Sequence, residues 1–137
     1  MSDAAMKNTG PAARSKVRPK YLNLVEIRLP LPGWVSILHR ISGAALFVSI
    51  TWLLWMLDRS LASEAGFEKV RHYATLWPVK LALLGLVWAY CHHFCAGIRY
   101  LLLVLHKGIE LAPARRSSVV VFVVSLALTA AIAAKLW

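Results

Sequence analysis

The chain has 137 residues, the size of a single domain. Hydrophobic residues make up 59% of it, charged residues only 16%, and the mean hydropathy is +0.61, which argues against a soluble globular domain. A net charge of +10 would suggest nucleic-acid binding in a soluble protein. Here the basic residues lie mainly outside the apolar runs, so we expect charges that flank membrane spans and no nucleic-acid partner.

Residues 1–33 are predicted to form a basic, cytoplasmic N-terminal segment. The first part of this segment carries several cations, little apolar periodicity and a single acidic residue, Asp3, as in a flexible tail. No apolar stretch follows the cations directly, so a cleaved secretory signal is not expected. A mitochondrial transit segment, which is also basic and poor in acids, remains an open alternative.

Three long apolar runs follow, and we predict transmembrane helices at about residues 34–57, 78–105 and 117–136. At about 1.5 Å of rise per residue, each helix can cross a hydrocarbon core of roughly 30 Å. A buried helical core in a soluble protein is the alternative, but runs this long would leave too little polar surface to cover them. The predicted fold class is therefore an all-α membrane protein, with residues 34–137 as a three-helix transmembrane domain.

The segments between the spans predict a short helix and an orientation. Glu64, Glu68 and Arg71 have helical spacing, which favours a short surface helix between the first two spans. Lysine and arginine residues before the first span and between the second and third outnumber those between the first and second by nine to three, or by nine to four if Lys80 is included. The positive-inside rule therefore predicts a cytoplasmic N-terminus and an external C-terminus.

Several ionisable residues fall within the predicted spans, where each costs about 2.5 to 3.5 kcal/mol on insertion scales. His39 and Arg40 lie near the cytoplasmic end of the first span. Arg40 can snorkel to the lipid headgroups, which would need no further function. Ser36 and Gly43 share its helix face, however, so a hydroxyl, a cation and bare backbone are placed together as they would be to receive a polar ligand headgroup.

His92 and His93 lie roughly 18 Å deep in the second span, too far from either surface to snorkel. A neutral histidine hydrogen-bonded to a neighbouring helix is one interpretation. A haem ligand is the sharper hypothesis for His93, because Ala89 and Gly97 on its face would let a flat macrocycle approach. Helix geometry does not choose between the two histidines, since the face of His92 also carries small and basic residues, namely Gly85, Ala96 and Arg99.

The other two spans lack a second ligand at this depth. The corresponding levels fall near Phe47 and Leu128, where there is no His, Cys or Met. If a six-coordinate haem is bound here, another polypeptide must supply its second axial ligand. His39, Arg40 and Arg99, which lie nearer the cytoplasm, would be placed to meet the haem propionates.

Four motifs in this chain resemble the cytochrome b membrane-anchor subunit of bacterial succinate dehydrogenase, which is respiratory complex II. The resemblance runs from about Arg18 to the end of the chain. Its motifs are Arg18-Pro-Lys-Tyr-Leu-Asn23-Leu, Ile27-Arg28-Leu-Pro30, Ser36-Ile-Leu-His39-Arg40-Ile-Ser42-Gly43 and His93-Phe-Cys-Ala-Gly97-Ile-Arg99. The order and spacing of the last two make the resemblance specific.

The resemblance implies a fold and a set of partners. The three spans would form part of a two-subunit haem-binding helical bundle in the bacterial inner membrane, in contact with membrane lipid. A second small anchor subunit would supply the other haem ligand. A flavoprotein would oxidise succinate and an iron-sulfur subunit would relay the electrons. The chain would thus belong to an enzyme, succinate:quinone oxidoreductase, without being catalytic on its own.

The resemblance also implies roles for individual residues. His93 would be the axial ligand of haem b, with no other metal ligand from this chain. Ser36 and Arg40 would contribute to the ubiquinone-reduction site. The haem propionates or pocket would be contacted by His39, Arg40, Arg99 and Gly97. Two positions depart from the family pattern: Tyr100 stands where a histidine often follows Gly-Ile-Arg, and Val104 where an aspartate often closes the helix, with His106 two residues later.

Three alternatives to this function stay open on the sequence. A fumarate reductase anchor would run the same chemistry in reverse. A haem-free structural anchor would use its histidines only for hydrogen bonds between helices. A small transporter or channel would need polar residues in all three spans, whereas the third span is almost purely Val, Ala and Leu.

Overall fold

The computed structural model describes residues 28–136, so the expectations for the basic tail at residues 1–27 lie outside the described residues. Within residues 28–136 the chain forms four α-helices and no strand. They are α1 (Leu31–Ala62), α2 (Glu64–Thr75), α3 (Trp77–Val104) and α4 (Leu111–Leu136). The predicted all-α membrane fold is confirmed.

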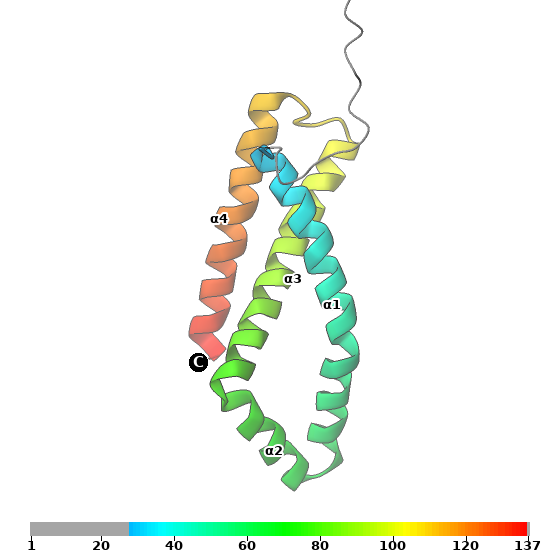
Figure 1. Cartoon of the computed structure of the whole chain (residues 1–137), viewed down its shortest axis with the longest axis vertical. Coiled ribbons are helices and arrows are strands. Elements are labelled where there is room, and N and C mark those ends of the chain that lie inside the picture. Colours follow the sequence, from blue (N-terminus) through cyan, green and yellow to red (C-terminus); the bar gives the residue numbers. More distant parts are fainter. Residues whose placement is uncertain (1–27, 137) are drawn as a thin grey trace, which may run out of the picture.

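The three long helices run antiparallel to their neighbours in sequence, with α2 crossing one end of the molecule (Figure 1). Helices α1 and α3 approach each other closely near the start of α1 and diverge towards α2, which bridges the gap (Figure 1). Helix α4 packs along α3. The start of α1 and the α3–α4 connection therefore share one end of the molecule, which we call the N-end, and α2 lies at the other, the α2 end.

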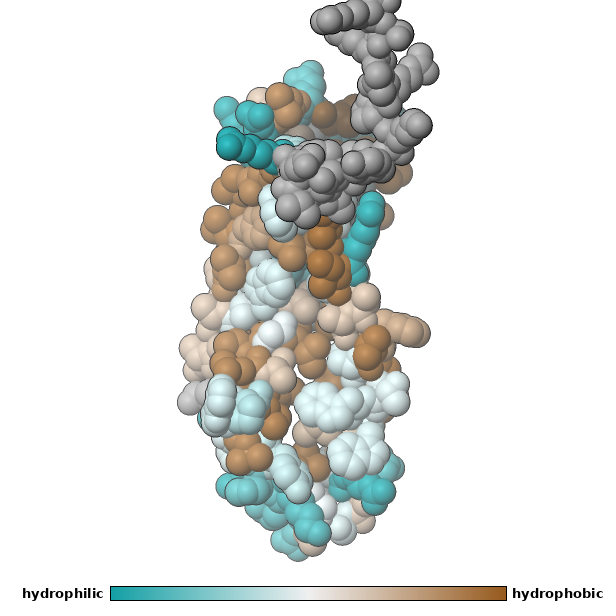
Figure 2. Space-filling model, in the orientation of Figure 1, coloured by the Kyte–Doolittle hydropathy of each residue, from teal (hydrophilic) through white to brown (hydrophobic). Residues whose placement is uncertain are grey.

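Three helices, α1, α3 and α4, are long and apolar enough to cross a membrane. Polar side chains gather at the two ends of the molecule and apolar side chains dominate the upper part of the surface between them (Figure 2). Only 6% of the most apolar stretch of α1 is buried within the chain, compared with 22% for α3. Most of α1 is thus left to contact lipid or another subunit.

The spanning helices extend beyond the apolar runs from which they were predicted. Helix α1 begins at Leu31 rather than residue 34, because Pro32 in its first turn is compatible with a helix start. It continues past residue 57 through polar residues as far as Ala62. Helix α4 begins at Leu111 rather than residue 117, so its first two turns, which include Arg115 and Arg116, lie before the apolar run. Helix α3 differs from the predicted 78–105 by one residue at each end.

The short helix expected between the first two spans is α2. Its N-cap is Ser63, whose hydroxyl oxygen accepts a hydrogen bond from the Gly66 amide at 3.0 Å. Gly66 also lies against the backbone carbonyl of Arg59, where a Cβ atom would clash. The cap and the glycine together hold the first turn of α2 tightly against the last turn of α1.

The α3–α4 connection begins with a Schellman motif. The amide of His106 donates to the carbonyl of Leu103 at 3.0 Å, and that of Lys107 donates to Leu102 at 3.0 Å. His106 takes a left-handed conformation, with φ of 57°, at the position where glycine is usual. His106 therefore ends α3 and lets the chain turn back towards α4 at the N-end.

Helix α4 packs through a stripe of small hydroxyl side chains. The buried residues of this helix are Ser118, Val121, Ser125 and Thr129. The hydroxyls donate to carbonyls of their own helix, for example Thr129 to Ser125 at 2.7 Å, so no hydroxyl of the stripe is left unpaired within hydrocarbon. Because these side chains are small, α4 can approach α3 closely, and Val121 meets Ala96 of α3 and Val35 of α1 in a common core.

Candidate functional site

Two histidines and two glycines form the contact between α1 and α3 near the N-end. The ring of His93, on α3, packs against Gly43 of α1, where a Cβ atom would lie 2.7 Å from Cε1 of the imidazole. Conversely, Nε2 of His39, on α1, lies 3.8 Å from the position of a Cβ at Gly97 of α3. The two imidazoles stack with their centroids 4.1 Å apart and their planes inclined by 8°. On each helix, a glycine thus leaves space for the histidine ring of the other helix.

The hydrogen bonds of His93 define which nitrogen carries its proton. Its Nδ1 lies 3.0 Å from the backbone carbonyl oxygen of His39. Because a carbonyl oxygen only accepts, Nδ1–H must donate, and in the neutral ring Nε2 then carries the lone pair. The hydroxyl of Ser42 donates to the same carbonyl at 3.0 Å and lies 3.3 Å from Nδ1. Within residues 28–136, Nε2 makes no hydrogen bond, so this imidazole has the tautomer and the free nitrogen of a metal ligand.

His92 has a different environment, although it is the next residue. It is completely buried, with Trp88 and Phe122 packed on its ring at centroid distances of 5.2 and 5.4 Å. Neither of its ring nitrogens has a hydrogen-bond partner in the described part of the chain. His92 therefore faces the interior between α3 and α4, whereas His93 is only partly buried.

We expect Phe47 of the first span at the membrane depth of His93, but the structure places Ser42 of α1 beside His93. His93 lies eleven residues before the end of α3 at Val104, and Ser42 lies eleven residues after the start of α1 at Leu31. The depth was predicted from the start of the apolar run, which is not the start of the helix. The ring of His39 is therefore in direct contact with that of His93, instead of lying well displaced from it towards the N-end.

Ser36 lies on α1 between this cluster and the N-end, and Arg40 directly follows His39 at the level of the cluster. They are four residues apart and so share a helix face. Ser36 is partly buried and Arg40 is exposed. In the described structure neither side chain forms a hydrogen bond or an ion pair, so a hydroxyl and a cation remain available to a ligand or to another subunit.

Arg99 is directed to α4. Its Nε donates to the Ser117 hydroxyl at 3.0 Å, and one terminal nitrogen donates to the Ala114 carbonyl at 3.4 Å. Its side chain is buried and its guanidinium carbon lies 5.5 Å from the centre of the Tyr100 ring. The structure therefore joins His39, His93 and Gly97 in one cluster and gives Arg99 a role in holding α4.

Two residues of this cluster were absent from the predicted site. Ser42 has a signal in the sequence, because it lies one helical turn after His39 and next to Gly43. In the sequence Tyr100 is only a departure from the family pattern, yet its ring lies 5.1 Å from that of His39. The Tyr100 hydroxyl is buried and has no hydrogen-bond partner among residues 28–136.

The same residues contain no multidentate metal site. Among residues 28–136 there is no group of three or more His, Cys, Asp or Glu side chains able to hold an ion. The cluster offers one imidazole nitrogen with a fixed tautomer. Chemically, this suits a metal whose remaining ligands come from outside these residues.

Comparison with known proteins identifies a matching family and several relatives. Residues 14–132 match the family model described as the succinate dehydrogenase/fumarate reductase transmembrane subunit. The chain is 34% identical to the succinate dehydrogenase cytochrome b556 subunit of Paracoccus denitrificans over 101 residues, which cover 74% of this chain and 78% of the relative. The subunit of the same name from Coxiella burnetii is 36% identical over 111 residues, covering 79% and 87%. That of Rickettsia felis is 30% identical over 112 residues, covering 82% and 87%.

The Gly43 contact can be tested by adding one methyl group. We expect Gly43→Ala to destabilise the assembled protein by about 1 to 3 kcal/mol, because its Cβ would overlap His93 and force α1 away from α3. Gly85→Ala is the matched control, since a Cβ at that position of α3 meets no atom within 4 Å. The measurement is the thermal midpoint of each purified complex at one scan rate. Equal midpoints for the two variants would contradict the proposed fit.

The link from Arg99 to α4 can be tested at Ser117. Ser117→Ala leaves a buried guanidinium nitrogen without its acceptor, so we expect a loss of about 1 to 3 kcal/mol of stability. Ser49→Ala is the control, because that hydroxyl bonds only to Leu46 of its own helix, and a change within about 0.5 kcal/mol is expected. Thermal midpoints of the two purified complexes provide the comparison. A Ser117 variant as stable as the control would show that this contact does not hold α4.

Proposed function

This chain belongs to the succinate dehydrogenase/fumarate reductase transmembrane subunit family as a cytochrome b anchor subunit, and we propose that it binds haem b through His93 and contributes to a ubiquinone-reduction site. It is a multi-pass membrane protein and a subunit of an enzyme complex. The observation that carries the haem proposal is the free Nε2 of His93, whose ring is fixed by the His39 carbonyl.

The surroundings of the two adjacent histidines favour His93 as the ligand. A haem shared between subunits needs an imidazole at a surface that another chain can reach. His93 is partly buried, at the crossing of two helices, and its Nδ1–H has the backbone carbonyl partner that is typical of metal-bound histidines. His92 is enclosed by Trp88 and Phe122 within this chain.

The stacking of His39 on His93 supports a second ligand from a partner. The His39 and His93 rings stack with their centroids 4.1 Å apart, which leaves no room for another group between them, so His39 would not share with His93 in holding a haem. The partner we propose is a second small membrane-anchor subunit, seated on the largely unburied surface of α1.

Haem b, when bound, supplies a one-electron carrier of tunable potential. The residues of this chain would fix its environment. The Ser42 hydroxyl and the Nδ1–H of His93 both donate to the His39 carbonyl. These hydrogen bonds would fix the plane of the imidazole and make Nε2 a stronger electron-pair donor to a metal. His39 and Gly97 border the same pocket, while the side chain of Arg99, held by α4, would supply positive charge near the propionates.

Ser36 and Arg40 are the residues that we propose for the quinone site. Their side chains are free of partners within residues 28–136. Ser36 lies about one turn from His39 on the N-end side, and Arg40 directly follows His39. The Ser36 hydroxyl would donate to a quinone carbonyl oxygen. Arg40 would stabilise negative charge as it develops on the ring, and its hydration shell would supply protons. Partner subunits would complete the pocket.

The cation distribution and the family suggest the setting of the complex. We propose the bacterial inner membrane with the N-end on the cytoplasmic side, where flanking cations are most numerous. A flavoprotein and an iron-sulfur subunit would bind there and deliver electrons from succinate. The family description also covers fumarate reductase, but the relatives above are all named for succinate dehydrogenase, which favours that direction.

The haem assignment is tested by replacing each histidine with leucine in the intact complex. We expect His93→Leu to abolish the b-type band in a reduced-minus-oxidised spectrum, because the ligand nitrogen is gone. His92→Leu is the matched control and should keep the band with unchanged or higher stability, since it removes two buried nitrogens that have no partner. Loss of the band in His92→Leu alone would reverse the assignment. A wild-type complex without any band would support a haem-free anchor.

The quinone assignment is tested by Ser36→Ala and Arg40→Gln. Each should lower succinate:ubiquinone reductase activity by about tenfold to a hundredfold, the value of a hydrogen bond to a charged or developing-charge group. Electron transfer from succinate to a soluble dye should be unchanged, because the dye takes electrons before they reach the membrane. Arg116→Gln, an exposed cation at the same end, serves as the control. Normal quinone reduction in both variants would exclude this pair from the site.

A further inference from the structure

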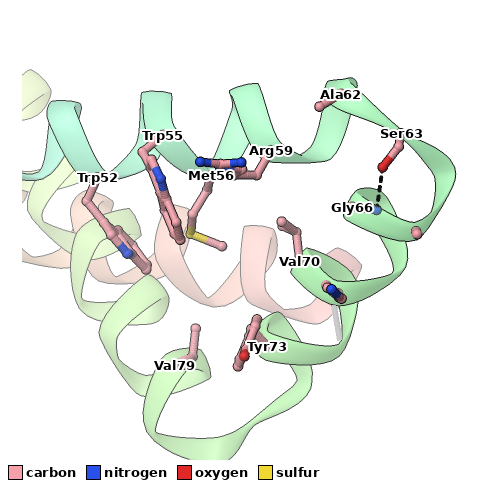
Figure 3. A pocket seen from close by; sticks show the side chains of 12 residues that line it. Trp52, Trp55, Met56, Arg59, Ala62, Ser63, Gly66, Val70, Tyr73 and Val79 are labelled. Carbon is pink, nitrogen blue, oxygen red and sulfur yellow. Dashed lines mark hydrogen bonds between the residues drawn. The ribbon is translucent and has the colours of Figure 1, made fainter.

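A cavity lies at the α2 end of the molecule, away from the His39–His93 cluster. It has a volume of about 550 Å³, within the range of small-molecule sites. Its walls come from the last turns of α1, from α2 and from the start of α3. Figure 3 shows Trp52, Trp55 and Met56 of α1 pointing into the space, with Tyr73 of α2 and Val79 of α3 on its other side.

The charge in this cavity is of one sign. Arg59 and Lys69 line it and no acidic side chain does. Neither cation forms an ion pair in the part of the chain that the structure describes. The neighbouring Glu68 pairs with Arg71 at 3.1 Å on the exposed side of α2. The cavity therefore combines aromatic and apolar walls with two uncompensated positive charges.

The position of the cavity defines the kind of molecule that can reach it. It lies where two spanning helices end, so it meets the boundary between headgroups and hydrocarbon. Tryptophan and tyrosine are the side chains that favour this boundary, and cations here attract anionic lipids. The N-cap at Ser63 and the tight contact at Gly66 hold α2 across the cavity, which fixes Lys69 opposite α1.

We propose that this cavity binds a phospholipid with an anionic headgroup. The lipid phosphate would lie between Arg59 and Lys69, and the glycerol and first acyl carbons would pack on Trp52, Trp55 and Met56. A zwitterionic lipid would bring a positive group that finds no acidic side chain in the lining. A quinone has a neutral head and gains less from two cations. The site does not depend on haem binding at His93.

The test uses the intact purified complex after removal of native lipid by detergent exchange. Native mass spectrometry would measure retention of added phosphatidylglycerol or phosphatidylcholine for the wild type, Lys69→Gln and Arg59→Gln. The matched control is Arg71→Gln, which removes the same charge from the outer side of α2. We expect each cavity variant to lower phosphatidylglycerol affinity by about fivefold and the control to change it less than twofold.

A second measurement places the lipid in the cavity. Phosphatidylglycerol with brominated acyl chains should quench tryptophan fluorescence, and replacing both Trp52 and Trp55 with Phe should remove that component. Lys69 is exposed on α2, so Lys69→Gln carries the test if Arg59→Gln does not assemble. Equal binding of phosphatidylcholine, an unchanged affinity in Lys69→Gln, or displacement of the lipid by ubiquinone would each overturn the proposal. Binding of inorganic phosphate without lipid would also overturn it.

Discussion

The reciprocal insertion of His39 and His93 at Gly97 and Gly43 determines how α1 meets α3. A spanning helix in lipid gains little from simple apolar burial, because lipid tails are as apolar as its own side chains. Close backbone approach, stacking and interhelical hydrogen bonds must then decide the packing. At this crossing the two glycines allow the approach, the imidazoles stack, and the His39 carbonyl accepts from the other helix. The group available for chemistry is thus part of the contact that joins the helices.

The other polar side chains within the spans satisfy their hydrogen bonds in two ways. Hydroxyls such as those of Ser125 and Thr129 donate to backbone carbonyls of their own helix, and these residues act as small packing residues. Arg99 instead bonds to the adjacent helix, where the early start of α4 brings the Ser117 hydroxyl and the Ala114 carbonyl within reach. Among residues 28–136 the buried Tyr100 hydroxyl is one exception, and the larger one is His92, whose two ring nitrogens stay unpaired. Its burial against aromatic rings contributes packing at the cost of that hydrogen bonding.

Features set by composition and depth could be predicted from the sequence, and features set by exact helix ends could not. The apolar runs predicted three spans, and the cost of burying an imidazole pointed to His92 and His93. Their different environments depend on the neighbouring helices, because Phe122 of α4 packs on the ring of His92 and the His39 carbonyl of α1 accepts from His93. The alignment of His93 with Ser42 depended on the start of α1 at Leu31, which lies before the apolar run. For the same reason, the first turns of α4, which lie before the apolar run and include two arginines, gave no hydropathy signal that Arg99 would bind there.

The exposed surface of α1 has a consequence for the amount of this subunit in a cell. With only 6% of its most apolar stretch buried, α1 leaves most of its apolar surface uncovered when the chain is alone. Membrane quality control removes chains in proportion to the time they spend incompletely packed. An orphan copy made in excess of its partners is therefore the form most exposed to proteolysis. An imbalance in subunit dosage would then be corrected after synthesis, by degradation of the copies that fail to assemble.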